Sequence, residues 1–202
     1  LIHSTPTALS VTRRYLAGAS VGNYALFAGG YDGSNRDTVN AYNASLTRST
    51  PTGLSVARRN LAGASVGNYA LFAGGYGDSY RSTVDAYDTS LTRSTPTALS
   101  AGRSSLAGAS VGNYALFAGG YGSSPRYKDT VDAYDTSLTR STPTALSVAR
   151  NDLAGASVGN YALFAGGYGS SPTRKNTVDA YDTSLTRSTP TALSVARNDL
   201  AG

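Results

Sequence analysis

The chain has 202 residues, of which 40% are hydrophobic and 14% are charged, and it contains no Cys, Met or Trp. Its 17 Lys and Arg exceed its 12 Asp and Glu by five, but these charges are scattered singly and form no basic run typical of nucleic-acid binding. Without Cys and with His3 as its one histidine, the sequence excludes disulfides, a thiolate nucleophile, Cys-ligated zinc, and a histidine-dependent catalytic or metal site in every repeat.

The longest apolar segments, such as 24–28, are far shorter than the about 20 residues that cross a bilayer. We therefore predict no membrane insertion. A chain that begins without Met is a mature chain, a proteolytic piece or a segment of a longer protein, and it carries no signal peptide that would indicate a compartment.

An internal repeat dominates the sequence. The segment Gly-Asn-Tyr-Ala-Leu-Phe-Ala-Gly-Gly begins at Gly22, Gly67, Gly112 and Gly159, with periods of 45, 45 and 47 residues. The chain accordingly divides into a leader and four repeats, at 1–18, 19–63, 64–108, 109–155 and 156–202. Because the leader matches the tail of a repeat, it is expected to supply a spare outer strand.

Four short strands are predicted in each repeat, and in the first repeat they lie near 16–21, 24–28, 38–42 and 46–54. Gly22-Asn23 is a two-residue hairpin signal, since both residues tolerate positive φ. A turn over 43–45 follows the third strand, and in the other repeats an Asp caps this turn. Pro51 falls in the predicted fourth strand, which favours an edge position because Pro has no N–H to donate.

Four antiparallel strands in a repeat of this length favour a β-propeller blade, and three features resemble the kelch repeat family. A Gly-Gly pair follows the second predicted strand, at 29–30, 74–75, 119–120 and 166–167. A Tyr-Asp pair, or Tyr-Asn in the first repeat, ends the third strand at 42–43, 87–88, 134–135 and 181–182. An Arg precedes each first strand, at 13, 58, 103 and 150, and recurs at 197. The Trp usual in kelch repeats is absent, and Leu46, Leu91, Leu138 and Leu185 stand nearby instead.

The resemblance implies an all-β propeller built from four kelch-like blades plus a partial repeat. Kelch-like propellers usually have six or seven blades, and the leader and the strand near 185–193 would compete for one place in a closed ring. The chain is therefore expected to belong to a longer array or to pair through its ends with another copy. An open β-solenoid stack of the same sheets is the alternative architecture.

Differences between the repeats are concentrated in two segments. The third and fourth repeats differ at three aligned positions, all in the loop between the second and third strands, and a second variable pair follows the Arg before each first strand. An up-and-down sheet places both segments at the same end, where Arg and Tyr side chains suit recognition of a protein or a glycan. The candidate ligand-binding residues are Tyr15, Arg36, Tyr80, Arg81, Arg126, Tyr127, Lys128, Arg174 and Lys175. The alternative is that these exposed loops vary because nothing constrains them.

Other repeated residues have simpler interpretations. Arg48, Arg93, Arg140 and Arg187 either form a basic ring or pair with Asp85, Asp132 and Asp179 of their own sheets. Tyr24, Tyr69, Tyr114 and Tyr161 either form an aromatic ladder or pack in the core and at its rim. The loop 32–37 has oxygen donors at short spacing but lacks the Glu of a calcium loop, so no metal or other cofactor is predicted.

The sequence thus favours a non-enzymatic recognition scaffold whose variable loops bind a protein or a glycan. A structural subunit that assembles through its terminal strands into a ring, fibre, surface layer or virion appendage is the alternative. No repeat combines an acid/base pair with a nucleophile and a positioned histidine, so an enzyme is not predicted. A composition without Cys or Met is compatible with an extracellular or surface setting.

Overall fold

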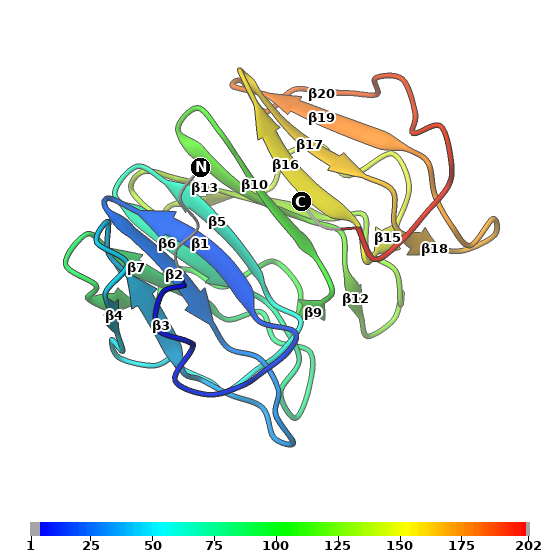
Figure 1. Ribbon diagram of the computed structural model, residues 1–202. Helices are drawn as coiled ribbons and strands as arrows, with labels where there is room; N and C mark the ends of the chain where they lie inside the picture. Colours follow the sequence, from blue (N-terminus) through cyan, green and yellow to red (C-terminus); the bar gives the residue numbers. More distant parts are fainter. Residues whose placement is uncertain (1–4, 201–202) are drawn as a thin grey trace.

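The computed structural model describes residues 5–200, and in this part of the chain every regular element is a β-strand (Figure 1). It contains no helix that could span a membrane. Four four-stranded antiparallel sheets follow one another along the chain, each with its strands in sequence order. Sheet 1 contains β1 (Ala17–Val21), β2 (Tyr24–Ala28), β3 (Val39–Tyr42) and β4 (Arg48–Ser49). Sheet 2 contains β5 (Ala62–Val66), β6 (Tyr69–Ala73), β7 (Val84–Asp88) and β8 (Arg93–Ser94).

The other two sheets have the same plan. Sheet 3 contains β10 (Ala107–Val111), β11 (Tyr114–Ala118), β13 (Val131–Asp135) and β14 (Arg140–Ser141). Sheet 4 contains β16 (Ala154–Val158), β17 (Tyr161–Ala165), β19 (Val178–Asp182) and β20 (Arg187–Ser188). Two short ribbons accompany them, β9 (Arg103–Ser104) with β12 (Tyr121–Gly122) and β15 (Arg150–Asn151) with β18 (Tyr168–Gly169).

The predicted turns are confirmed. Gly22 has a φ of 51°, and the hairpin that it opens pairs Val21 with Tyr24. After the third strand of sheet 3, the Asp135 carboxylate accepts the backbone N–H groups of Ser137 and Thr139 at 2.8 and 2.9 Å. The side chain of an Asx residue therefore closes this turn in the way expected from the sequence.

The fourth strand is much shorter than predicted, with two residues in place of a strand over 46–54. Leu46 has a positive φ and closes the turn, so the strand begins only at Arg48. Beyond Ser49 the chain leaves sheet 1, and the carbonyls of Thr52 and Gly53 accept bonds from side chains of sheet 2. Pro51 therefore lies after the strand and not within it.

We call the segments between successive sheets links; they run over 50–61, 95–106 and 142–153. The described part of the leader, 5–16, lies on sheet 1 as the link 50–61 lies on sheet 2: Tyr42 donates to the Thr7 carbonyl at 2.7 Å, and Tyr87 donates to the Thr52 carbonyl at 2.8 Å. The expected spare outer strand is therefore not found within 5–16, because this segment occupies the place of a link.

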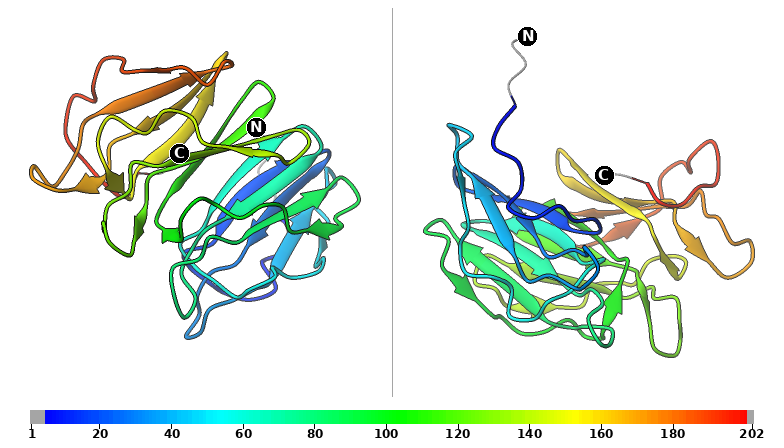
Figure 2. Two further views of the ribbon diagram at one scale, coloured as in Figure 1. Left: turned by 180° about the vertical axis from the view of Figure 1, so that it is seen from behind. Right: turned by 60° about the horizontal axis from the view of Figure 1, so that its bottom comes forward.

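The first strand of each sheet lies innermost, against the first strand of the next sheet (Figure 2). Ser65 donates through Oγ to the Ser20 carbonyl at 2.6 Å, and Ser110 donates in the same way to the Ser65 carbonyl at 2.7 Å. We call the sheet face that carries the Phe of the second strand and the Tyr of the third strand the front, and the opposite face the back. The front of each sheet packs on the back of the preceding sheet. Between sheets 1 and 2, Phe72 and Tyr87 of the front bury Leu26 of the back. The same contacts recur between sheets 2 and 3 and between sheets 3 and 4.

The described sheets form an open row, with sheets 1 and 4 at its two ends (Figures 1 and 2). The prediction of an all-β protein of repeated four-stranded antiparallel sheets is confirmed. Closure of the ring is not observed among residues 5–200.

Candidate functional site

The two variable segments of each repeat lie side by side at one end of the sheets. Arg59, in the link before sheet 2, forms an antiparallel bridge with Tyr76, in the loop between β6 and β7. Arg14 and Tyr31 form the same bridge in sheet 1. Links and loops therefore contribute to one surface, as the alternation of an up-and-down sheet predicts.

The Gly-Gly pair makes this close approach possible. Gly29 has a φ of 69°, and a Cβ atom there would lie 2.6 Å from the carbonyl oxygen of Arg58. The next residue, Gly30, donates its N–H to that same carbonyl at 2.9 Å. Because any side chain at Gly29 would collide with this carbonyl, glycine is needed here, and the pair holds the link against the loop that begins with Tyr31.

Planar side chains from these segments form one continuous row across all four sheets, which we call the tyrosine–arginine row. Its members are Arg14, Tyr15, Tyr31, Arg59, Tyr76, Tyr80, Tyr121, Tyr127 and Tyr168. The guanidinium carbon of Arg59 lies 4.7 Å from the ring centre of Tyr31 and 5.1 Å from that of Tyr76. These distances are typical of cation–π contacts.

Tyrosines take over the bridging role farther along the row. The ring centre of Tyr80 lies 5.2 Å from that of Tyr76 and 5.8 Å from that of Tyr121. Tyr127 connects Tyr121 to Tyr168 at 5.7 and 6.0 Å. The tyrosine after each Gly-Gly pair is thus linked to the next by one intervening side chain.

The variable positions change in matched pairs. Each loop residue of the row can be matched by its position in the repeat with one residue of the following link, and in every pair one side chain is large and planar and the other is small and polar. From sheet 1 to the end of the row these pairs are Asn35 with Arg59, Tyr80 with Ser104, Tyr127 with Asn151, and Arg174 with Asn198. At the first step Arg59 donates to Asn35 at 2.7 Å. At the last step the partners are exchanged, and Arg174 donates to Asn198 at 3.3 Å.

The pairing predicts a compensated double variant. Tyr80→Asn is expected to lower the free energy of unfolding by about 1–3 kcal/mol, since it removes two aromatic contacts worth about 0.5–1.5 kcal/mol each. Adding Ser104→Arg reproduces the first step of the row and should recover at least part of that loss. Urea unfolding of the wild type, both single variants and the double variant checks this, and simple additivity of the two effects would contradict it.

The structure places the predicted site residues in four situations. Tyr80 and Tyr127 lie in the middle of the row, and Tyr15, which is 52% exposed, lies at its end beside Arg14. Arg126 and Arg174 are exposed on their loops. Burial, together with the neighbouring Tyr121 and Tyr76, raises the pKa of Tyr80.

Arg36 and Arg81 pair with carboxylates of their own loops. Arg36 lies 2.6 Å from Asp32, which raises the pKa of the guanidinium, and the bond from Arg36 lowers the pKa of Asp32. Arg81 lies 3.4 Å from Asp78. The Asp32 carboxylate in the loop 32–37 therefore accepts hydrogen bonds from Arg36.

Lys128 and Lys175 differ from the expectation. They are 9% and 7% exposed, and their ammonium groups donate to the carbonyls of Ser123 and Ser170 at 2.9 and 2.6 Å. The hydrophobic stems pack inside the loop while the charged ends brace it. These two lysines support the loop conformation and are not placed to meet a ligand directly.

Six members of the row were not predicted, namely Arg14, Arg59, Tyr31, Tyr76, Tyr121 and Tyr168. The four tyrosines are the same in every repeat, so differences between the repeats do not indicate them. The signal that identifies them is their place directly after the Gly-Gly pair. The other tyrosine series packs at the core rim, where Tyr24, Tyr69 and Tyr114 contact the buried clusters.

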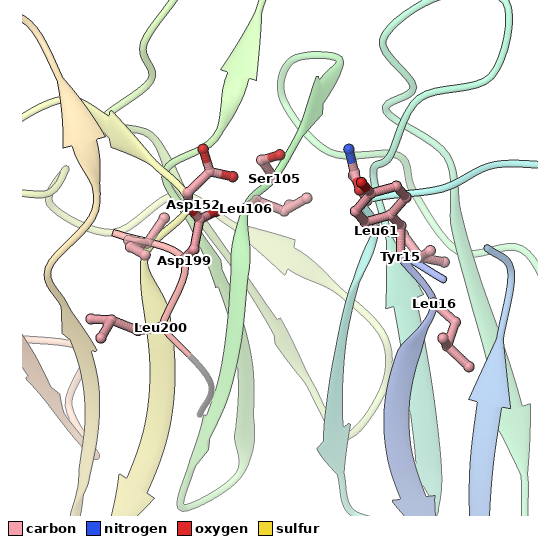
Figure 3. Close-up of a pocket in the computed structure, with 10 residues that line it drawn as sticks. Tyr15, Leu16, Leu61, Ser105, Leu106, Asp152, Asp199 and Leu200 are labelled. Atoms are coloured by element: carbon pink, nitrogen blue, oxygen red, sulfur yellow. The ribbon is translucent and has the colours of Figure 1, made fainter. Parts of the chain in front are cut away.

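A recess of about 290 Å³ lies beside the row, where the links enter the first strands (Figure 3). Tyr15 lies on one side of it and Asp152 and Asp199 on the other. The N–H of Asp199 donates to the Asp152 carbonyl at 3.1 Å, and the N–H of Asp152 donates to the Ser105 carbonyl at 3.0 Å. Burial raises the pKa of Asp152, and the nearby Asp199 adds to this effect.

Among residues 5–200, no three His, Cys, Asp or Glu side chains are grouped as a metal site would need. Comparison with models of known protein families finds no match. The sequence likewise matches no curated protein.

Proposed function

We propose that this protein is a non-enzymatic recognition scaffold that binds a protein or glycan ligand along the tyrosine–arginine row. The observation that carries the proposal is the continuity of the row over four sheets, with each planar side chain held by its neighbours. Side chains already fixed by stacking lose little conformational entropy on binding, which favours affinity.

The chemistry of the row suits both ligand classes. Tyrosine and arginine are, with tryptophan, the residues enriched at energetic hot spots of protein interfaces. Tyrosine rings also offer apolar surface and a hydroxyl to sugar rings. A shallow recess of about 390 Å³ beside Tyr76, Tyr80 and Tyr121 offers room for such a group.

The proposal includes the finer architecture. We infer that the four sheets are kelch-like blades of a propeller, on the strength of the Gly-Gly, Tyr-Asp and Arg positions and of first strands that lie innermost. A setting outside the cell or on a surface agrees with a chain that lacks the oxidation-sensitive residues Cys and Met.

A second candidate function is assembly as a structural subunit. Apolar sheet faces that are uncovered at both ends of the row of sheets favour it: Phe27 and Leu46 at one end and Val158 at the other are among the exposed large hydrophobic residues. Exposed apolar faces of this kind mark interaction sites or aggregation liabilities.

A ligand screen tests the recognition function. We expect the full chain to select ligands from an oligosaccharide array or a random-peptide phage library. Replacing Tyr80 and Tyr127 together by Ala should lower the affinity for the selected ligand by about tenfold or more. A tenfold change corresponds to a loss of roughly 1.4 kcal/mol of binding free energy. Calorimetry measures the affinity, and near-ultraviolet circular dichroism verifies folding.

Tyr161→Ala is the matched control, because Tyr161 is an exposed tyrosine outside the row. Its affinity should equal that of the wild type. Selection of no ligand, or equal binding by the double variant, would count against the row as the recognition surface.

A further inference from the structure

The two ends of the row of sheets expose residues that are buried everywhere else. On the front of sheet 1, Phe27 is 36% exposed, whereas its equivalents Phe72, Phe117 and Phe164 are fully buried. On the back of sheet 4, Val158 is 61% exposed, whereas the equivalent valines of sheets 1 to 3 are 2–3% exposed. Each end therefore presents one half of a contact that the chain makes three times internally.

The two halves match because the repeats are nearly identical. In the inner contacts, a front Phe and Tyr pack on the apolar back of the preceding sheet. Sheet 1 offers the same front, with a recess of about 710 Å³ that includes Phe27, Tyr42 and Leu46. Sheet 4 offers the same back, with a recess of about 290 Å³ that includes Ala156, Leu163 and Leu193. The geometry of a further front-to-back contact is thus given by the three existing ones.

Each inner contact contains one link, but the two free ends carry two equivalent segments. Residues 5–16 occupy the front of sheet 1, and residues 189–200 occupy the back of sheet 4, where Leu193 donates its N–H to Asn176 and Arg197 donates its N–H to Lys175. The link 50–61 is bound to sheet 1 by equivalent bonds from Leu54 and Arg58. A contact between the two ends has room for one of these segments.

The leader lacks the buried ion pair that the links of sheets 2 to 4 make. In sheets 2 to 4 the link arginine pairs with a buried Asp at 2.8 Å, but in sheet 1 Asn40 stands at that position. Arg13 is nevertheless buried, and within residues 5–200 its Nε and Nη1 atoms have no hydrogen-bond partner. Release of the leader therefore breaks no buried ion pair and returns a desolvated cation to water.

Residues 189–200 carry the groups needed to replace the leader on sheet 1. The leader uses the Thr7 carbonyl, Ser10 and Arg13 to bond Tyr42, Asn40 and the Phe27 carbonyl. Thr191, Ser194 and Arg197 are the identical residues at the corresponding positions. In a single copy of the chain, Arg197 is exposed beside the recess on the back of sheet 4.

We propose that two copies of this chain join head to tail: the back of sheet 4 of one copy receives the front of sheet 1 of the next, and residues 189–200 replace the partner's leader. This inference rests on the second candidate function and names its partner as a second copy. A contact between two different faces extends into an open filament or closes into a ring, according to the rotation at each step.

Light scattering of the full chain over a wide concentration range provides the first test. We expect species larger than the 20.7 kDa chain to increase with concentration. A chain that remains a monomer throughout overturns both the assembly function and this inference.

Mixing of two single variants tests the head-to-tail contact separately. Phe27→Asp spoils the front of sheet 1, and Val158→Asp spoils the back of sheet 4, so each variant alone should be a monomer. An equimolar mixture retains one intact front and one intact back and should form a dimer of twice the chain mass, and no larger species. Thr173→Asp, in an exposed loop of sheet 4, is the control and should assemble like the wild type.

Gly18→Ala is a second front variant for the case in which Phe27→Asp does not fold. A Cβ atom at Gly18 meets only the Phe27 side chain and a Leu26 carbonyl at 3.7–3.9 Å, but its equivalent at Gly63 would lie 2.1 Å from the Gly18 carbonyl of the preceding sheet. It should therefore fold and fail to accept a partner. If the wild type assembles and the mixture of variants does not form the dimer, assembly stands and the head-to-tail contact is overturned.

The exchange of segments has its own readout. Leu9→Ser should loosen the leader and shift the midpoint of assembly to about tenfold lower concentration, equivalent to roughly 1.4 kcal/mol, because Leu9 lines the recess on the front of sheet 1. Leu193→Ser, the same change at the matching position, should shift the midpoint to higher concentration. A leader variant that assembles no better than the wild type would overturn the displacement of residues 5–16.

Discussion

Asp132→Asn is expected to lower the free energy of unfolding by about 3–5 kcal/mol, the range measured when one partner of a buried ion pair is removed. Arg103 Nη2 lies 2.8 Å from Asp132, and both side chains are fully buried. Burial lowers the pKa of Arg103, and Asp132 opposes that shift. The variant leaves this guanidinium in the core without a counter-charge. Urea denaturation followed by circular dichroism measures the loss.

The effect is large because Asp132 joins several parts of the fold. Its carboxylate also accepts Arg140 of β14 at 2.8 Å and the backbone N–H and hydroxyl of Ser100 in the link at 3.2 and 3.1 Å. Arg103 in turn donates to the Phe117 carbonyl of β11 at 3.1 Å. The group therefore fastens the link to the second, third and fourth strands of sheet 3, and equivalent groups surround Asp85 and Asp179.

The reciprocal change in sheet 1 is the matched control. Asn40→Asp supplies a carboxylate to Arg13 and should raise the free energy of unfolding by about 1.5–3 kcal/mol, the worth of a hydrogen bond to a charged group. Opposite signs for the two variants would follow from a single cause, the balance of charge beside the link arginine. If Asp132→Asn lowers the free energy of unfolding no more than an ordinary surface substitution does, the ion pair does not hold the link on the sheet.

These buried groups show how far the sequence alone could lead. Of the two interpretations of the outer arginine series, local pairing is the one observed in sheets 2 to 4. Arg93, Arg140 and Arg187 lie 3.8, 2.8 and 3.1 Å from Asp85, Asp132 and Asp179. The sequence could not show that Arg103 joins the same carboxylate, because the two residues come from different segments whose approach depends on the Gly-Gly pair. The sequence also could not predict that these ion pairs are buried, since charged residues in a strand are usually on its solvent face.

The same limit applies to the candidate site. Differences between the repeats indicate Tyr80 and Tyr127, because the side chains at these positions vary and pack differently from one repeat to the next. They could not indicate the invariant Tyr76 and Tyr121 between which these side chains stack. They also could not reveal that Lys128 donates to a carbonyl of its own loop, since a lysine in a loop can equally extend into solvent. Alternation predicted the strands well, but the fourth one is short because its continuation bonds to the next sheet.

Gly108→Ala is expected to destabilise the protein by about 3 kcal/mol or more, above the usual cost of overpacking. Gly108 lies in β10, and a Cβ atom there would lie 2.3 Å from the carbonyl oxygen of Gly63 in β5. The obstacle is backbone, so no side-chain rotation relieves it. The innermost strands of sheets 2 and 3 would have to separate, and with them the hydrogen bond from Ser110 to the Ser65 carbonyl.

Gly18→Ala is the same substitution at the same position of sheet 1, where no preceding sheet lies against the strand. Added Cβ contacts of 3.7–3.9 Å are ordinary van der Waals distances, so the stability of the monomer should be unchanged or slightly higher, because Ala restricts the unfolded chain. Thermal unfolding of both variants at a concentration that keeps the chain monomeric compares them directly. The difference between them isolates the close approach of neighbouring first strands from the intrinsic effect of glycine in a strand. Equal melting temperatures would mean that the first strands do not pack against one another, and would contradict the packing of the sheets on which the continuity of the tyrosine–arginine row depends.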